Sequence, residues 1–488
     1  MTLSILDAAR EQPERIALVE AGRPVTWSAL ATEATRVLRR LRDRGVRAGQ
    51  ERPVALVAPA DSATVTLIHA LIATAVPVHL LHPRLAEVER RRLLDRIDPA
   101  FEIGDRERAE LLEGVAGADR GAAGEDAPGR DPGAAVDAPP ADERTLAVVY
   151  TSGTTGSPKG VILSRRAFAA AAAASAANLG WREHDRWLLD LPVAHVGGLS
   201  IVTRCLLART AVVLPDRGME GVARTISAVE HDRVTLLSLV PTQRRRLLGA
   251  RPAWDPPEHV RAILVGGAPA PIPLLEQAAD RGWPVLTTYG LTECCSQVAT
   301  QRPGTVNRGR LGAGPPLPGI HVRIRDAEIQ VRSAALFTGY FPRRSGPPFL
   351  DDGWFATGDR GELDAEGNLH PRGRLDDVIV SGGENVDPLE VELALESQDG
   401  VREACVFGVP DEEWGERVVA AVVPEPGASL DESLLLAALR ARLAGFKVPR
   451  SISAVAEIPV NRTGKPDRSA LRGRALAAAR NLPVDQQP

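Results

Sequence analysis

Residues 150–161 read Tyr-Thr-Ser-Gly-Thr-Thr-Gly-Ser-Pro-Lys-Gly-Val and directly follow the apolar run Leu-Ala-Val-Val at 146–149. Hydroxyl side chains alternate with glycines here, and a single lysine, Lys159, stands near the end. Glycines let backbone amides approach an anion, hydroxyls donate further hydrogen bonds, and the lysine adds a positive charge. A P-loop needs four residues between its first glycine and Gly-Lys-Ser/Thr, a spacing that this stretch lacks. It therefore predicts a polyphosphate-binding loop of another kind, with a glycine-rich surface turn as the alternative.

Four further motifs follow along the chain. They are Tyr289-Gly-Leu-Thr-Glu293, Trp354-Phe-Ala-Thr-Gly-Asp359, Gly373-Arg374-Leu-Asp376-Asp377 and Asn461-Arg-Thr-Gly-Lys465. Together with the stretch at 150–161 they stand in the order typical of the adenylate-forming superfamily, which contains acyl-CoA synthetases, peptide-synthetase adenylation domains and luciferases. The chain resembles this family over nearly its whole length. One such string can arise by chance, whereas five in the same order are very specific.

Length and composition indicate a globular protein with more than one domain. The chain has 488 residues, 44% of them hydrophobic, and a formal net charge of -4. This length exceeds one ordinary core, which predicts two or more domains. Arginines and acids are interspersed, so binding to nucleic acid is not predicted. No apolar run reaches membrane-spanning length, so insertion into a membrane is not predicted either.

The cysteines and the first residues indicate a compartment. Cys205, Cys294, Cys295 and Cys405 show no Cys-x-x-Cys spacing, so we expect reduced thiols rather than a disulfide framework. The chain starts Met-Thr-Leu-Ser-Ile-Leu-Asp, without a basic segment followed by an apolar one, so we expect no signal peptide. A cytoplasmic location is therefore predicted. The sequence leaves the oligomeric state open, a homodimer included.

Alternating strand and helix patterns predict an α/β fold. A capped amphipathic helix is expected over 24–46, with Thr26-Trp27-Ser28 at its start, and a second helix at 64–74. Strands are expected at 52–57, 211–215, 234–239, 262–265 and 284–288. Such alternation predicts layered, mostly parallel sheets flanked by helices. Residues 105–143 are dominated by Gly, Ala, Asp, Glu and Pro, and we expect a mobile surface insertion or an irregular connection there.

The pattern changes after Arg374. Short strands are expected at 378–380, 404–409 and 417–423, with helices from Pro388 and at 431–443. Such a segment of roughly 110 residues has a normal size for a domain. The resemblance implies a mobile α+β domain with its hinge at Asp376. We therefore predict two domains, an acid- and ATP-binding domain at 1–375 and a small lid domain at 376–488.

The resemblance implies a two-step reaction that uses ATP, Mg²⁺ and coenzyme A. A carboxylic acid and ATP form an acyl-AMP and pyrophosphate, and the CoA thiol then displaces AMP to give the acyl-CoA. The first step gathers carboxylate, α-phosphate and Mg²⁺ against mutual repulsion, which requires positioning and fixed positive charge. The residues that would hold the β- and γ-phosphates are Thr151, Ser152, Gly153, Thr154, Thr155, Gly156 and Lys159.

The other motifs would hold the rest of the nucleotide. The resemblance implies that Thr292 donates to the α-phosphate and that Glu293 holds Mg²⁺ as a hard oxygen ligand. Asp359 would accept both ribose hydroxyls, and Arg374 would contact ribose or phosphate. The residues that would surround adenine are Gly266, Gly267, Ala268, Tyr289 and Gly290.

Lys465 matches the catalytic lysine of the family. Its ammonium would bridge the substrate carboxylate and the α-phosphate. The resemblance further implies that the small domain swings about Asp376 after adenylation, so that the loop at Gly382 and Gly383 lines the path of the thiol. We expect Lys465→Ala to abolish acyl-AMP formation and largely to spare thioester formation from supplied acyl-AMP.

The segment 191–200 resembles the part of the family that places an aromatic residue or a histidine, here His195, beside the acyl pocket. Amino-acid-activating domains usually carry an aspartate in this region, whereas residues 191–209 contain no acid. Arg204 lies in an apolar stretch, where an unpaired charge would be costly. The sequence leaves open whether Arg204 binds a substrate carboxylate, reaches solvent or forms a structural ion pair. The other residues expected at the pocket are Ser200, Ser296 and Gln297.

Within the superfamily, several strings resemble the o-succinylbenzoate–CoA ligases of menaquinone biosynthesis. They are Val-Pro-Thr-Gln at 240–243, Gly-Gly-Ala-Pro-Ala-Pro at 266–271, Thr-Glu-Cys-Cys-Ser-Gln at 292–297 and Gly-Gly-Glu-Asn at 382–385. This resemblance implies a substrate with two carboxylates, of which the succinyl one is activated and the aromatic one would meet Arg204. The chain departs from the family at Asp387 and Phe446, where tyrosine is common.

Other functions share parts of these patterns. Ligases for other aryl or acyl acids share several strings, and a carrier-loading enzyme shares the first half-reaction. No carrier-like segment follows Lys465, which favours free CoA. A non-catalytic nucleotide-binding protein would be expected to have lost Lys465, Glu293 or Asp359, and all three are present. A luciferase-like oxidoreductase would require an oxidisable luciferin, to which no residue points.

Overall fold

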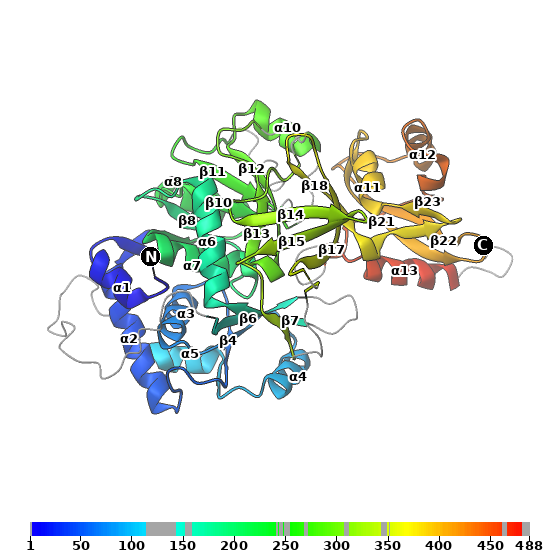
Figure 1. The fold of residues 1–488 in the computed structure, drawn as a ribbon. Helices are drawn as coiled ribbons and strands as arrows, with labels where there is room; N and C mark the ends of the chain where they lie inside the picture. The colour runs from blue at the N-terminus through cyan, green and yellow to red at the C-terminus, as the bar shows by residue number, and fades with distance from the viewer. Residues whose placement is uncertain are drawn as a thin grey trace.

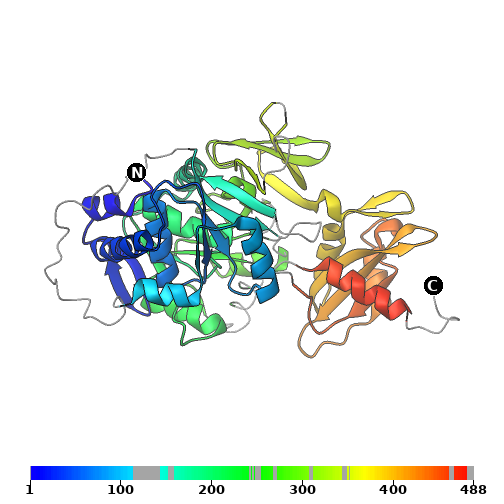
Figure 2. The same ribbon diagram turned by 90° about the horizontal axis from the view of Figure 1, so that it is seen from below.

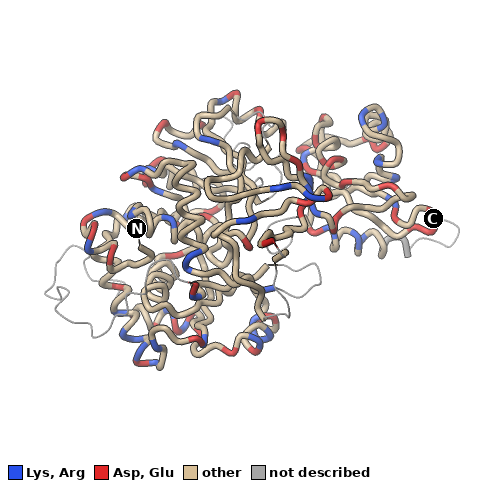
Figure 3. Tube along the Cα trace, viewed as in Figure 1, with Lys and Arg blue, Asp and Glu red and all other residues tan. Residues whose placement is uncertain are grey.

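The computed structural model describes residues 2–113, 143–151, 159–240, 243, 247, 254–267, 272–306, 312–342, 349–350, 352–460 and 466–480. These residues form a large body and, after Arg374, a smaller unit to one side of it (Figure 1, Figure 2). Basic and acidic residues are interspersed over both parts (Figure 3). Within the described ranges, no helix has the length and apolar character needed to cross a membrane.

An eight-stranded sheet lies in the body, in the order β13-β12-β11-β10-β8-β9-β1-β2. Its strands are β1 (Ile16–Glu20), β2 (Arg23–Thr26), β8 (Arg186–Leu188), β9 (Ala211–Leu214), β10 (Leu236–Leu239), β11 (Ala262–Val265), β12 (Val285–Leu291) and β13 (Ser296–Thr300). The pairs from β1 to β12 are parallel, and the two edge strands, β2 and β13, pair antiparallel. The predicted mostly parallel sheet is thus confirmed here.

A second, six-stranded sheet has the order β16-β7-β6-β4-β3-β5. Its strands are β3 (Val54–Val57), β4 (Val78–Leu81), β5 (Phe101–Ile103), β6 (Thr145–Thr151), β7 (Lys159–Ser164) and β16 (Gly339–Phe341). The half from β5 to β6 is parallel, and β7 and β16 continue it antiparallel. The phosphate-binding motif therefore connects the two antiparallel strands β6 and β7.

Helices cover both sheets of the body. They are α1 (Ile5–Glu11), α2 (Trp27–Asp43), α3 (Ser62–Thr74), α4 (Glu87–Ile97), α5 (Asp105–Leu112), α6 (Arg165–Leu179), α7 (Val196–Ala208), α8 (Gly221–His231) and α10 (Ile272–Asp280). Helix α6 contacts β7 of one sheet, β13 of the other, and α7. The alanine-rich sequence of α6 suits this place, because small side chains let a helix fit between two sheets. Thr26 caps α2 by accepting from the amide of Ala29, which confirms the predicted capped helix.

The segment 105–143 is a partial correction. We expected an insertion or irregular connection from residue 105, yet Asp105–Leu112 forms α5. Leu111 is fully buried, and the Arg108 guanidinium pairs with Asp61, the residue that caps α3. The prediction failed because it relied on the Gly-, Ala- and Pro-rich composition of the residues that follow, which gives no information on the burial of Leu111 or on the Arg108–Asp61 pair. Residues 114–142 lie outside the described part of the chain.

A third sheet was not expected from the sequence. Strands β14 (Ile320–Arg325), β15 (Glu328–Ser333), β17 (Phe355–Leu363) and β18 (Leu369–Arg374) pair antiparallel in that order. This sheet matters for the site because β17 contains residues 355–359 of the Trp354–Asp359 motif and β18 ends at Arg374. Antiparallel neighbours need no crossover helix between them, so the alternation that revealed the other sheets is missing here.

The small unit packs helices on both faces of one sheet. Its elements are β19 (Ile379–Ser381), β20 (Glu384–Val386), α11 (Pro388–Glu396), β21 (Val401–Asp411), β22 (Gly415–Pro424), α12 (Glu432–Arg440), β23 (Ser451–Ala454) and α13 (Arg468–Arg480). Alternate residues of β21 and β22 face α11 and α12 on one side and α13 on the other, as the two-residue period of a strand requires. The predicted strands and helices of this segment are confirmed.

Candidate active site

Three strands bring Tyr289, Asp359 and Arg374 together. Tyr289 lies on β12, Asp359 on β17 and Arg374 at the end of β18. The Tyr289 hydroxyl donates to Oδ2 of Asp359 at 2.6 Å, and Nη1 of Arg374 donates to Oδ1 at 3.0 Å. Burial, followed by the neighbouring carboxylate, raises the pKa of Tyr289 well above its usual value. The phenol therefore remains a donor, and it holds the Asp359 carboxylate, which the sequence predicts to bind ribose.

Glu293 lies one residue into a short 3-10 helix, η1 (Thr292–Cys294), that directly follows β12. Its Oε1 accepts a hydrogen bond from the Tyr340 hydroxyl at 2.9 Å, and its carbonyl accepts one from the Phe337 amide at 2.8 Å. Burial raises the pKa of the Glu293 carboxyl. A cation beside this group would offset that cost, because opposite charge favours the ionised form. Thr292 is the first residue of the same short helix.

The two ends of the predicted phosphate loop are held side by side. Thr151 ends β6 and Lys159 begins β7, and the two residues are paired across the strands. The Thr151 hydroxyl donates to the Lys159 carbonyl at 3.4 Å. The Lys159 ammonium lies 5.8 Å from the centre of the Tyr340 ring. The other predicted members, Ser152, Gly153, Thr154, Thr155 and Gly156, lie outside the described residues.

Close backbone approach explains two of the predicted glycines. A Cβ on Gly266 would lie 2.6 Å from Cγ2 of Thr288, and one on Gly290 would lie 1.9 Å from the carbonyl oxygen of Ser296. Gly267 has φ +84°, which favours glycine. These contacts make the glycines structural requirements of β11, β12 and β13, in addition to any contact with adenine. Ala268 lies outside the described residues.

His195 caps the start of α7, next to a histidine that the sequence did not single out. The ring centres of His195 and His82 are 5.2 Å apart, with 37° between their planes. Nδ1 of His82 accepts a hydrogen bond from the Arg84 amide at 3.1 Å. Ser200, one turn into α7, is buried and donates to the Gly197 carbonyl at 3.0 Å. Ser200 thus has a partner within its own helix.

Arg204 is buried, and no carboxylate of the described residues pairs with it. Its residue is only 3% exposed, and neither Nε nor Nη2 has a hydrogen-bond partner in the described part of the chain. The guanidinium carbon lies 5.4 Å from the centre of the Trp187 ring. Burial lowers the pKa of Arg204 to about 10. Among the alternatives left open by the sequence, neither the solvent-exposed arginine nor the structural ion pair is found among the described residues.

Gln297 and Ser296 lie on β13. The Gln297 side chain is buried, and its Nε2 donates to the Thr300 hydroxyl at 2.8 Å. Its Oε1 is buried without a partner among the described residues. Ser296 pairs with Leu291 at the start of the strand and has φ +99°. Gln297 therefore retains an acceptor for a ligand, whereas the structure gives no such indication for Ser296.

Fewer of the predicted residues of the C-terminal segment are described. Asp376 lies in the 3-10 helix η2 (Leu375–Asp377), 3.6 Å from Nη2 of Arg374. Gly382 and Gly383 form the turn between β19 and β20 with φ +61° and +82°. A Cβ on Gly382 would lie 2.6 Å from the Trp414 ring, so this turn too requires glycine. Lys465 lies outside the described residues.

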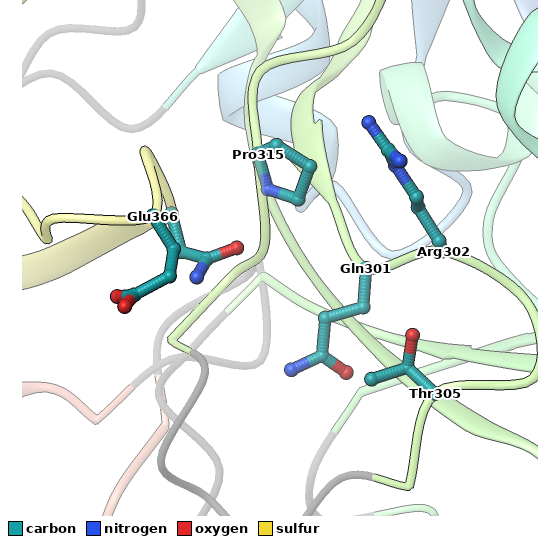
Figure 4. A pocket seen from close by; sticks show the side chains of 6 residues that line it. Gln301, Arg302, Thr305, Pro315 and Glu366 are labelled. Atoms are coloured by element: carbon teal, nitrogen blue, oxygen red, sulfur yellow. The ribbon is translucent and has the colours of Figure 1, made fainter.

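A polar pocket of about 260 Å³ lies elsewhere in the body (Figure 4). It is lined by Gln301, Arg302, Thr305, Pro315, Glu366 and Asn368, and in this view Glu366 lies on the opposite side of Pro315 from Gln301 and Arg302. None of the predicted site residues lines this pocket. The candidate site is therefore defined by the polar contacts around Asp359 and Glu293.

Sequence reasoning missed Tyr340 and His82, which touch predicted site residues. No motif that we recognised contains either one. The only available signal for Tyr340 was an aromatic residue in the short run Gly-Tyr-Phe at 339–341. Its contact with Glu293 joins positions 47 residues apart, which a local pattern does not reveal.

Comparison with known proteins shows the family of the chain. A family model described as AMP-binding enzyme matches residues 5–341, and one described as AMP-binding enzyme C-terminal domain matches residues 390–465. The chain is 34% identical to the 2-succinylbenzoate–CoA ligase of Bacillus pumilus, covering 97% of this chain and 98% of the relative. It is 36% identical to the enzyme of the same name from Geobacillus kaustophilus, covering 93% and 94%.

Solved structures give the same result. The o-succinylbenzoate CoA synthetase MenE of Bacillus subtilis, in complex with the acyl-adenylate intermediate OSB-AMP, superposes with a TM-score of 0.84 at 31% identity, over 97% of this chain and 98% of that chain. ATP-bound MatB of Rhodopseudomonas palustris gives a TM-score of 0.83 at 27% identity, over 97% and 99%. The chain belongs to the AMP-binding enzyme family.

Proposed function

We propose that this protein is an ATP-dependent, AMP-forming acid–CoA ligase whose acid is o-succinylbenzoate, a step of menaquinone biosynthesis. The curated relatives described above are named 2-succinylbenzoate–CoA ligases and align over nearly the full chain. MenE of Bacillus subtilis has been solved with ATP and magnesium ion, and with the acyl-adenylate. A shared fold alone would not support a particular acid, so the substrate has to be argued from the site.

The nucleotide half of the proposal rests on the polar cluster. Asp359, fixed by Tyr289 and Arg374, offers a carboxylate to the ribose hydroxyls. Thr151 and Lys159 lie at the two ends of the predicted phosphate loop and would contact the β- and γ-phosphates. Thr292, next to Glu293, would donate to the α-phosphate. We expect that these groups mainly position the triphosphate and neutralise its charge.

The residues around Glu293 fit a magnesium ion. In the described part of the chain, no group of three or more His, Cys, Asp or Glu gathers in a way that could hold a metal. A cation at Glu293 would thus have one protein carboxylate, with phosphates and water completing its shell, as Mg²⁺ commonly does. When bound, Mg²⁺ supplies charge neutralisation to the phosphate oxygens.

The substrate assignment rests on the burial of the Arg204 guanidinium without a carboxylate partner among the described residues. An arginine buried without a carboxylate is costly, and a ligand carboxylate beside it would repay much of that cost. The activated succinyl carboxylate has to reach the α-phosphate, so a second, remote carboxylate is what Arg204 would bind. o-Succinylbenzoate has such a group on its ring. The ionised acid carries no hydrogen-bond donor, so the buried Oε1 of Gln297 would accept from a bound water rather than from the acid itself.

The small unit would complete the reaction. We propose a domain boundary at Asp376, with Lys465 delivered to the acid and the α-phosphate in the first step. Rotation about Asp376 would then bring the Gly382-Gly383 turn towards the thiol of CoA. A cytoplasmic location and a homodimer stay predictions from the sequence.

The test is acid-dependent pyrophosphate release with ATP and Mg²⁺, followed by detection of the CoA thioester. We expect o-succinylbenzoate to be turned over, and 4-oxo-4-phenylbutanoate, which lacks the ring carboxylate, to be a much poorer substrate. Turnover of simple benzoates alone would replace this proposal with another aryl–CoA ligase. An acyl-AMP that reacts with a carrier-bound pantetheine and not with CoA would indicate a carrier-loading enzyme.

A further inference from the structure

Tyr340 lies between two charged residues of the candidate site. It is the middle residue of β16, the edge strand that pairs antiparallel with β7, and it stands opposite Val161. Lys159 is two residues from Val161, so its side chain leaves β7 on the same face and is a diagonal neighbour of Tyr340. The Tyr340 ring also packs against Phe337 with 4.8 Å between ring centres. The backbone amide of Phe337 in turn donates to the Glu293 carbonyl at 2.8 Å.

One side chain therefore contacts a carboxylate and an ammonium from separate segments. The Tyr340 hydroxyl donates to Oε1 of Glu293 at 2.9 Å. The Lys159 ammonium lies 5.8 Å from the ring centre, within the range of a cation–π contact. These contacts use the two ends of the phenol, its hydroxyl and its ring face.

A phenol suits this place better than a charged side chain. A lysine or arginine at position 340 would also donate to Glu293, but its charge would cancel that of the carboxylate and repel Lys159. A glutamate would neutralise Lys159 and repel Glu293. The phenol orients both groups and leaves both charges in place.

We propose that Tyr340 is a positioning residue that aligns Glu293 and Lys159, so that a divalent cation and the triphosphate it accompanies bind as one unit. The inference rests on the proposed function, in which Glu293 faces the cation and Lys159 the phosphates. Partners that orient a metal-ligating carboxylate typically contribute about 10- to 100-fold to metal affinity when they are removed by mutation.

Equilibrium binding tests this role without requiring turnover. ATP is titrated into wild-type protein by calorimetry, once with Mg²⁺ and once with EDTA. For Tyr340→Phe, which keeps the ring, we expect binding of Mg–ATP to weaken about tenfold, at the lower end of that range. Binding of metal-free ATP should change less than twofold, because the ring below Lys159 remains. Tyr340→Leu should weaken both.

Phe349→Leu is the matched control for packing. Phe349 lies 5.6 Å from Phe337 on the same aromatic cluster, so its loss loosens the cluster while the Tyr340 contacts with Glu293 and Lys159 remain. We expect this variant to keep the wild-type ratio of Mg–ATP to metal-free ATP affinity. If Tyr340→Phe also keeps that ratio, or weakens both forms equally, the inference is wrong.

Failure of the inference and failure of the proposed function give different results. Wild-type protein that binds Mg–ATP yet releases no pyrophosphate with any acid contradicts the proposed function. Wild-type protein that adenylates o-succinylbenzoate, beside a Tyr340→Phe variant with unchanged metal dependence, contradicts only the role of Tyr340.

Discussion

Two arginines, a half-buried one in the small unit and a buried one in the body, have opposite surroundings. Arg468 in the small unit donates from Nη2 to Glu392 at 2.6 Å and from Nε to the Val406 carbonyl at 3.0 Å, and its Nη1 lies 3.4 Å from Asp377. Arg204 in the body faces the Trp187 ring, and its Nε and Nη2 have no hydrogen-bond partner among the described residues. Nearby carboxylates balance the charge of Arg468, whereas no carboxylate of the described residues balances the charge of Arg204.

The difference indicates what each arginine is for. Arg468 ties α13 to α11 and to Asp377, the residue after the proposed hinge. Helix α13 and the residue after the proposed hinge are thereby held together. Among the described residues, no carboxylate pairs with Arg204 in this way. This contrast fits the proposal that a ligand carboxylate pairs with Arg204.

The largest expected effect comes from breaking the ion pair of the small unit. Arg468→Met leaves Glu392, only 8% exposed, without its cationic partner. A buried charge that loses its partner typically costs about 3–5 kcal/mol of folding free energy, which urea unfolding would measure. The double variant Arg468→Met, Glu392→Met should recover most of this loss. If the single variant is as stable as the wild type, the ion pair does not contribute to the folding free energy.

Acid should destabilise the body more than the small unit. Burial, with Arg209 as a second cause, lowers the pKa of His69 to about 3, and burial lowers the pKa of His79 to about 4. The unfolded chain takes up these protons below about pH 6.5 while the folded body does not, so stability is lost as the pH falls from there. No histidine follows His370 in the sequence, so the small unit lacks this effect.

At pH 5 the expected loss is about 2 kcal/mol for each of the two histidines. Thermal unfolding of wild type and His69→Gln at pH 7 and pH 5 would measure it. The variant should lose less stability between the two pH values, by roughly the contribution of one histidine. Equal losses in both proteins would contradict the assignment to His69.

The variant Arg204→Met tests whether the unpaired arginine serves substrate binding rather than folding. Removing an unpaired buried charge offsets the lost contact with Trp187, so we expect the free energy of unfolding to stay within about 1 kcal/mol of wild type. The kcat/KM for o-succinylbenzoate should fall about 10- to 100-fold, because a hydrogen bond to a charged group contributes about 1.5–3 kcal/mol. For 4-oxo-4-phenylbutanoate it should hardly change. An equal fall for both acids would remove Arg204 from substrate recognition.

The smallest effect concerns an ion pair that joins the two regions. Asp387, where the family commonly has tyrosine, places Oδ2 3.5 Å from Nη1 of Arg360, the residue after Asp359. Partly exposed pairs contribute about 0.2–1 kcal/mol, so Asp387→Asn should shift the ratio of the two half-reaction rates by less than about fivefold. Glu362→Gln, which breaks the pair with Arg372 inside the body, is the control. A shift of the same size in both variants would show that the bridging pair has no special role.

Helices and strands with a clear local sequence pattern could be predicted from the sequence alone. Strand β11 was predicted with its observed ends, and the capped helix α2 and the alternating strands of the small unit were also predicted. The two ends of the phosphate loop could be placed because a strand, a glycine-rich turn and a lysine are consecutive in the chain. Each signal depends on residues within a few positions of one another.

Contacts between side chains from distant segments became known only from the tertiary structure. The contact of Tyr340 with Glu293, the third sheet that carries Asp359 and Arg374, and the burial of α5 all join segments far apart in the chain. The sequence left Arg204 with three alternatives, because a charge in an apolar stretch does not show whether a carboxylate faces it. That depends on how α7 packs against its neighbouring strands, which a local pattern does not specify. The physical reason is that periodicity sets the conformation of a segment, whereas partners are set by packing between segments.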